Sequence, residues 1–101
     1  MDVKTTLDNG VATVYLSGEL DHHNAAPLRE RVDRVIRERH PQKLVLDFGG
    51  ISFMDSSGIG FVMGRYKLMM SQGGCLQVRG ASARMEKVMR LAGLERLPIW
   101  Q

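Results

Sequence analysis

The sequence has little of what marks secreted or membrane-bound proteins. Its 101 residues include a single cysteine, Cys75, so no disulfide can form within the chain, and this suits the reducing cytoplasm. Residues 1–4 include Asp2 and Lys4 and lack the apolar core of a signal peptide. No uninterrupted apolar run approaches the roughly 20 residues that cross a bilayer. We therefore expect a cytoplasmic protein with no membrane partner.

The charge balance does not indicate a nucleic-acid partner either. The formal net charge is only +3, and many basic residues fall in one expected helix with acids four residues before them. These pairs are Glu30 with Arg34 and Asp33 with Arg37. Such spacing is typical of a solvated helix face, and no recognised nucleic-acid motif accompanies it. We expect no direct contact with nucleic acid.

What the sequence does contain is a regular alternation of strand and helix patterns. A hydrophobic fraction of 44% over this length fits one domain with its own core, residues 1–101. Strands are expected over residues 3–7, 11–17, 43–48, 75–79 and 97–100. Helices are expected over about residues 24–40, over residues 56–71, and from Ser82 to Gly93. Strands alternating with helices require a largely parallel sheet joined by right-handed crossovers.

Local signals add detail to this pattern. Asn9-Gly10, between the first two strands, favours a hairpin because both residues tolerate positive φ. Asn24 is a good N-cap for the first helix, and Pro41 ends that helix. Residues 49–54 are expected to form a loop. The fold class is therefore α/β: a mixed, mostly parallel sheet of about five strands with three helices and an antiparallel N-terminal hairpin at its edge.

The segment richest in chemistry is residues 54–60, between a buried strand and the start of a helix. Asp55 or Ser56 can cap that helix by accepting hydrogen bonds from its free N–H groups. The same N–H groups and the helix dipole tolerate a phosphate, and a serine hydroxyl on this loop is accessible to a kinase. Capping alone explains these residues equally well, so their spacing leaves both interpretations open.

Three enzymatic patterns come close to this segment and fail. A nucleophile elbow requires Gly-x-Ser-x-Gly, but Met54 and Asp55 stand where the first glycine should be. A P-loop requires Gly-Lys-Ser/Thr, which the sequence lacks. A dinucleotide fingerprint requires other spacings than those of Gly58, Gly60 and Gly64. We expect no catalytic residues and no bound cofactor, and a small nucleotide-binding protein remains the weakest alternative.

A second polar segment, residues 18–24, contains Asp21, His22 and His23. Adjacent histidines beside acids suggest zinc, but structural zinc sites use four ligands at recurring spacings, and no Cys/His pair elsewhere completes such a set. We expect no metal. Loops at the carboxyl ends of parallel strands gather on one edge of a sheet, so we expect Asp21 and Ser56 to be neighbours in space.

The second helix carries apolar residues on two sides. A helical wheel assigns to the core face Ile59, Val62, Met63, Tyr66 and Met70. It assigns to the opposite side, where water is expected, Ser57, Phe61, Gly64 and Leu68. An apolar stripe beside a polar site suggests a docking surface, although a neighbouring helix that covers part of the stripe explains it as well.

Several blocks of this sequence resemble a known family. The main ones are Gly18-Glu19-Leu20-Asp21-His22-His23, Ser52-Phe53-Met54-Asp55-Ser56-Ser57-Gly58-Ile59-Gly60 and Gly64-Arg65-Tyr66-Lys67. With Gly73-Gly74 and Ala92-Gly93-Leu94, they make nearly the whole chain similar to the STAS-domain anti-sigma factor antagonists, in particular those of sporulation in endospore-forming bacteria. The Asp-Ser-Ser-Gly motif in this order is fairly specific for that family.

The resemblance implies a mechanism of partner switching. The unphosphorylated protein would bind an anti-sigma factor that is also a serine kinase, and so free the sigma factor. That kinase would use its own ATP to phosphorylate Ser56, the first serine of the motif, with Ser57 as the alternative acceptor. A phosphatase, of the PP2C type or another serine phosphatase, would restore the active form. The same chemistry in a general stress-response pathway is the alternative function.

The resemblance also indicates where the partner binds. Asp21 matches a family position tied to partner binding, and it faces the serine loop. The expected partner-binding residues are Asp21, His22, Asp55, Ser56, Ser57, Gly58, Ile59 and Phe61.

Overall fold

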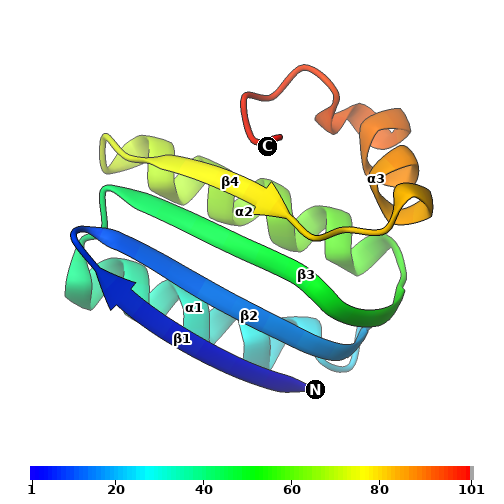
Figure 1. Cartoon of the computed structure of the whole chain (residues 1–101), viewed down its shortest axis with the longest axis horizontal. Coiled ribbons are helices and arrows are strands. Elements are labelled where there is room, and N and C mark those ends of the chain that lie inside the picture. Colours follow the sequence, from blue (N-terminus) through cyan, green and yellow to red (C-terminus); the bar gives the residue numbers. More distant parts are fainter. Residues whose placement is uncertain (101) are drawn as a thin grey trace.

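The computed structural model describes residues 1–100, in which four strands form one mixed sheet (Figure 1). The strands are β1 (Asp2–Asp8), β2 (Val11–Leu20), β3 (Lys43–Met54) and β4 (Cys75–Arg79). They lie in the order β1-β2-β3-β4, with β1 antiparallel to β2 and with β2, β3 and β4 parallel. The turn between β1 and β2 places Asn9 and Gly10 at positive φ, 51° and 79°, which confirms the expected hairpin.

Helices cover one face of the sheet and one corner. α1 (Ala25–Arg39) connects β2 to β3, and α2 (Ser56–Ser71) connects β3 to β4. Both lie behind the sheet in Figure 1, whereas α3 (Ala83–Met89) and the π-helical turn η1 (Arg90–Leu94) lie beyond β4. The expected α/β class, the mostly parallel sheet and the three helices are confirmed. None of the helices within residues 1–100 is long and apolar enough to span a membrane.

The expected fifth strand over residues 97–100 does not form. This segment meets β4 at one point only, a parallel bridge between Val78 and Trp100. The Val78 N–H donates there to the Ile99 carbonyl oxygen at 2.6 Å. Pro98 has no N–H with which to extend the ladder. The sheet therefore has four strands, close to the expected number of about five.

The core lies between the sheet and the two helices behind it. Leu28, Val32 and Ile36 of α1 are at most 2% exposed, at the i, i+4, i+8 spacing of a helical stripe. Burial of this stripe fixes α1, and so the loop before it, against the sheet. The strand residues buried to the same extent alternate along β2 and β3, and they are Ala12, Val14, Leu16, Leu20, Leu44, Leu46 and Phe48.

β2 and β3 continue further than the sequence pattern predicts. They run together to Leu20 and Met54, so the expected loop over residues 49–54 is wrong. Their pairing shifts register twice along this extension, and such irregularities hide the strand from a pattern based on alternation. The strands come so close at Gly50 that a Cβ there would lie 2.6 Å from the Ser17 Cβ, which requires glycine.

The buried face of α2 is rotated by about one residue, roughly 100°, from the expected face. Phe61, which the helical wheel assigned to water, is 4% exposed, and Met70, which it assigned to the core, is 50% exposed. The wheel fails because the buried stripe includes a glycine and an arginine, which interrupt its apolar pattern. The buried residues of α2 are Gly58, Phe61, Val62, Arg65 and Met69.

An ion pair is buried between α1 and α2. The Arg65 Nε lies 2.8 Å from the Asp33 Oδ1, and the two side chains are 6% and 12% exposed. The Arg65 Nε–H is not aligned with that oxygen, so the contact is an ionic one without a directed hydrogen bond. Asp33 therefore does not form the exposed pair with Arg37 that its spacing suggested. Its carboxylate pairs with a cation inside the helix interface.

Candidate functional site

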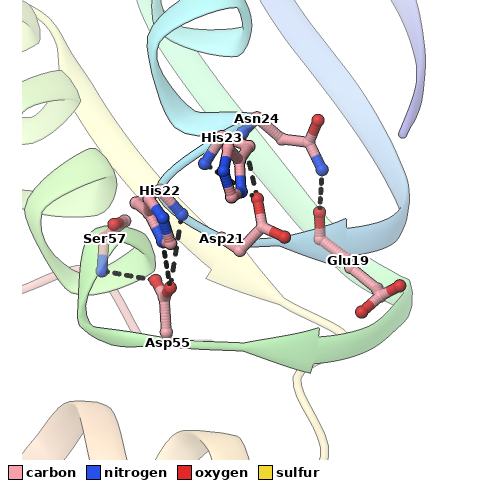
Figure 2. Close-up of polar contacts among 7 residues, drawn as sticks. All are labelled: Glu19, Asp21, His22, His23, Asn24, Asp55 and Ser57. Atoms are coloured by element: carbon pink, nitrogen blue, oxygen red, sulfur yellow. Dashed lines mark hydrogen bonds and ion pairs between the residues drawn. The ribbon is translucent and has the colours of Figure 1, made fainter.

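The loop between β2 and α1 is held by its own aspartate (Figure 2). The Asp21 Oδ1 accepts hydrogen bonds from the backbone N–H groups of His23 and Asn24, each at 3.0 Å. Asn24, the expected N-cap, makes no capping hydrogen bond with its side chain. Its amide donates instead to the Glu19 carbonyl oxygen at 2.8 Å. Asp21 therefore satisfies the N–H groups ahead of α1, which corrects the role expected for Asn24.

The connection between β3 and α2 is a single residue, Asp55, which caps the helix. Its Oδ1 accepts a hydrogen bond from the Ser57 backbone N–H at 2.8 Å. Its carbonyl oxygen accepts from the Gly58 N–H at 3.0 Å. Asp55, and not Ser56, is therefore the N-cap that the sequence left undecided. Ser56 begins α2 and is exposed, whereas Ser57 is half-buried.

His22 joins the two loops. Its backbone N–H donates to the Asp55 Oδ2 at 3.2 Å, and its Nδ1 lies 3.5 Å from the same oxygen (Figure 2). The Asp55 N–H donates in turn to the Leu20 carbonyl oxygen at 3.2 Å, at the end of β2. Each carboxylate oxygen of Asp55 has a separate task, because Oδ1 caps α2 and Oδ2 holds the neighbouring loop. The loops that carry Asp21 and Ser56 lie side by side, as expected.

The same hydrogen bonds keep the Asp55 carboxylate charged. The largest cause is the Ser57 backbone N–H, which lowers the pKa of Asp55 below its ordinary value of 3.8. Desolvation opposes this shift, and hydrogen bonds from the Ser57 hydroxyl and from His22 add to it. At neutral pH the site therefore presents a fixed negative charge beside the Ser56 hydroxyl.

The structure divides the residues expected at the partner surface into two groups. Gly58 is buried where a Cβ would overlap the Met54 side chain, and Phe61 is buried as well, so the placement of Phe61 on the water side of α2 is wrong. That these two residues take part in partner binding stays a prediction. Ile59 is half-buried. The residues that do gather around the two joined loops are Asp21, His22, Asp55, Ser56 and Ser57.

Two features of this region were missed by sequence reasoning. The link between His22 and Asp55 uses a backbone N–H, which every residue but proline has, so no residue pattern marks it. Arg65 was noted only within the family resemblance. A single arginine between apolar positions of a helix that must pack on a sheet was the available signal for a buried ion pair.

The described part of the chain contains no group of three His, Cys, Asp or Glu side chains placed to hold a metal ion. His22 and His23 stack on each other, with their ring centroids 4.1 Å apart. Both oxygens of Asp55 already accept hydrogen bonds from backbone N–H groups. What the site offers chemically is the Ser56 hydroxyl at a helix N-terminus, open to an outside partner.

Comparison with known proteins identifies the family. The sequence profile of the STAS domain matches residues 2–100. The chain belongs to the STAS family. An anti-sigma F factor antagonist of Paenibacillus polymyxa is 39% identical to this STAS chain over 92 residues, which cover 90% of this chain and 79% of that protein.

Two further comparisons place this STAS chain among the anti-sigma factor antagonists. The anti-sigma-B factor antagonist of Bacillus subtilis (strain 168) is 30% identical over 82 residues, which cover 81% of this chain and 73% of that protein. The solved structure of the Bacillus cell fate determinant SpoIIAA in its phosphorylated form has a TM-score of 0.79 at 29% identity, covering 99% of this chain and 89% of that one. The resemblance inferred from the sequence is confirmed.

Proposed function

We propose that this protein is a phosphorylation-controlled antagonist of an anti-sigma factor. In its unphosphorylated form it binds an anti-sigma factor that is also a serine kinase, and this binding frees the sigma factor. Phosphorylation of Ser56 by that kinase ends the binding, and a serine phosphatase restores it. The protein catalyses nothing itself, since the kinase brings the ATP, and it works in the cytoplasm, where Cys75 stays reduced.

The observation that carries this proposal is the position of Ser56. It is exposed and begins a helix of 16 residues, so a phosphate there would lie at the positive end of the helix dipole. Ser57 is half-buried, and its N–H is already bound to Asp55. The Ser56 hydroxyl is thus the more accessible of the two, and the free protein should accept the phosphate without unfolding.

The same position explains how a phosphate would end partner binding. A phosphoserine carries about −1.5 to −2 charges, and at Ser56 it would stand beside the Asp55 carboxylate and the Asp21 loop. A partner that covers these loops excludes the water that screens like charges, and such contacts cost several kcal/mol. Because each loss of about 1.4 kcal/mol weakens affinity tenfold, a local charge is sufficient to release the partner.

A second candidate function is antagonism of an anti-sigma factor of the general stress response. It is supported by the 30% identity to the anti-sigma-B factor antagonist of Bacillus subtilis. We favour the sporulation pathway because the anti-sigma F factor antagonist of Paenibacillus polymyxa is 39% identical. The chemistry at Ser56 would be the same in both pathways, and only the partner would differ.

Binding and phosphate transfer test the proposal together. The purified protein is mixed with the anti-sigma F factor of the source organism and, separately, with its sigma-B counterpart, with and without labelled ATP. We expect a complex with the first partner in the absence of ATP, label on this chain only when the kinase is present, and poor binding by Ser56→Asp. Binding to the second partner alone would select the stress pathway. Self-labelling or ATP hydrolysis by the protein alone would indicate an enzyme and contradict the proposal.

A further inference from the structure

A hollow of about 430 Å³ opens between the N-terminal parts of α1 and α2, where Ser57 forms part of its wall. Small residues keep it open, because Ala25 and Ala26 of α1 line it together with Gly60 and Gly64 of α2. A Cβ added at either glycine would meet no neighbouring atom within 4 Å. The volume falls within the range of about 300–1,000 Å³ that is usual for ligand sites.

The ionisable residues that line the hollow are basic. Arg65 is its most buried polar residue, with the guanidinium carbon 5.2 Å from the centroid of the Phe61 ring. Asp33 pairs with Arg65 from α1, and Asp55 contacts the His22 side chain. Among the residues that the structure describes, no acid lines the hollow itself, and its basic lining residues are His22, Arg29 and Arg65.

The two arginines are only partly compensated. Arg65 is buried, yet its Nε–H does not point at the Asp33 oxygen 2.8 Å away. Desolvation lowers the pKa of Arg65, Asp33 opposes this, and the positive charges of Arg29 and Arg37 lower it further. Arg29 and Arg65 therefore repel each other across the hollow. A negative group bound between them would be stabilised by both.

We propose that this hollow receives an acidic side chain, an Asp or a Glu, of the anti-sigma factor. The inference rests on the proposed function, because the hollow adjoins the loops that the partner would cover. A carboxylate matches the planar guanidinium of the exposed Arg29, which can bind it through two hydrogen bonds. A protein side chain fits better than a free anion, since methylene groups would contact Phe61 and the glycine backbone that form the apolar part of the lining.

Charge reversal on α1 tests this contact. Arg29→Glu places a negative charge where the partner's carboxylate is expected. Arg34→Glu makes the same change at an exposed position on the other side of the same helix and serves as the matched control. Calorimetry with the purified anti-sigma factor should show binding about tenfold weaker for Arg29→Glu, and within about threefold of wild type for Arg34→Glu.

A second variant fills the hollow without a change of charge. Gly64→Leu has room for its Cβ, and leucine favours a helix more than glycine does, so the variant should melt no earlier than wild type. We expect it to lose about tenfold in affinity for the anti-sigma factor as well.

Restored binding between Arg29→Glu and a partner with one acid replaced by arginine would identify the contacting residue.

The outcomes separate this inference from the function on which it rests. Equal affinity of wild type, Arg29→Glu and Gly64→Leu for the anti-sigma factor would overturn the inference that the hollow binds its carboxylate. The proposed function would stay intact. A wild-type protein that binds no anti-sigma factor would overturn both. Titration with inorganic phosphate and with acetate, followed by the amide shifts of Ser57 and Gly60, should show no saturable change. A saturable change that Arg29→Glu abolishes would identify a site for free anions and overturn the assignment to the partner.

Discussion

The His22 backbone N–H donates to the Asp55 Oδ2 at 3.2 Å, and this hydrogen bond ties the loop after β2 to the start of α2. The other oxygen of the same carboxylate caps α2 through the Ser57 N–H. Ser56 follows Asp55 directly in the chain. A group added to Ser56 therefore acts directly beside the link that holds the two halves of the site together.

Ser56 is expected to be the phosphoacceptor. The partner kinase should label wild type and Ser57→Ala but not Ser56→Ala, because Ser56 is exposed and Ser57 is half-buried. Ser56→Ala should still bind the partner and should lose regulation by ATP. Mass mapping of the kinase-treated protein locates the phosphate. Phosphate on Ser57 of the wild-type protein, with none on Ser56, would refute the assignment.

Phosphorylation should act through local charge and leave the fold unchanged. A phosphate at the start of α2 is compatible with the helix dipole, so nothing in the free protein needs to refold. We expect amide chemical shifts to change only in residues 21–24 and 54–60. Ser56→Ala treated with the same kinase is the control and should show no change. Shifts that spread through β1 and α3 would indicate a global switch.

Asp21→Ala should weaken partner binding and also lower stability. Its position in a loop suggests little effect on folding, but its carboxylate accepts hydrogen bonds from the N–H groups of His23 and Asn24. Loss of such a cap costs about 1 kcal/mol. Asp21→Asn keeps an acceptor oxygen and should retain most of that stability. Urea unfolding of the three proteins measures the difference, and an alanine variant as stable as wild type would show that the cap is dispensable.

Asp55 should make the folded protein sensitive to acid. Its pKa lies below the ordinary value of 3.8, chiefly because the Ser57 N–H stabilises the charged form. A carboxylate whose pKa is lowered by folding contributes stability that is fully present above pH 3.8. That stability is lost as the pH falls through the lower pKa of the folded state. The free energy of unfolding should therefore fall less steeply below pH 3.8 in Asp55→Asn than in wild type.

The acid titration has a matched control. Glu38→Gln removes a carboxylate from the exposed side of α1, away from both loops, and its unfolding free energy should follow wild type across the same pH range. If Asp55→Asn and wild type lost stability in parallel, the hydrogen bonds of Asp55 would not be the source of the sensitivity.

The Asp33–Arg65 pair should show strong coupling in a double-mutant cycle. Arg65→Met leaves the Asp33 carboxylate buried without its cation, and Asp33→Leu leaves the guanidinium without its anion. Removal of one member of a buried pair costs about 3 kcal/mol, whereas replacement of both by apolar residues is often neutral. Urea unfolding should find the double variant more stable than either single variant. Additive losses would contradict the coupling.

Periodicity was sufficient for the order of the elements through the third helix but not for their ends. The Asn9-Gly10 turn and the alternation of strands with helices predict the hairpin and the parallel sheet, because both signals can be read from short stretches of sequence. The extension of β3 through residues 49–54 depends on how closely two strands approach at Gly50, and that contact is not local. The burial of Phe61 was missed because Arg65 stands in the same buried stripe.

The site was predicted in outline for a similar reason. Asp21, Asp55 and Ser56 stand in recognisable motifs at the ends of strands, so the sequence places them together. The residue that caps each helix was harder to predict. Asp21 and Asn24 are both good acceptors by type, and only the path of the backbone decides which one reaches the free N–H groups.

β2 and β3 extend beyond their neighbours in the sheet. The pairing of β1 reaches only Ser17, and that of β4 ends at Asp47, whereas the two central strands continue to Leu20 and Met54. The loops that carry Asp21 and Ser56 thus stand at the tip of a two-stranded projection. Substitutions at that tip leave most of the packing beneath it undisturbed. Duplicated copies of such a gene could therefore acquire different partners while they keep one shared folding core.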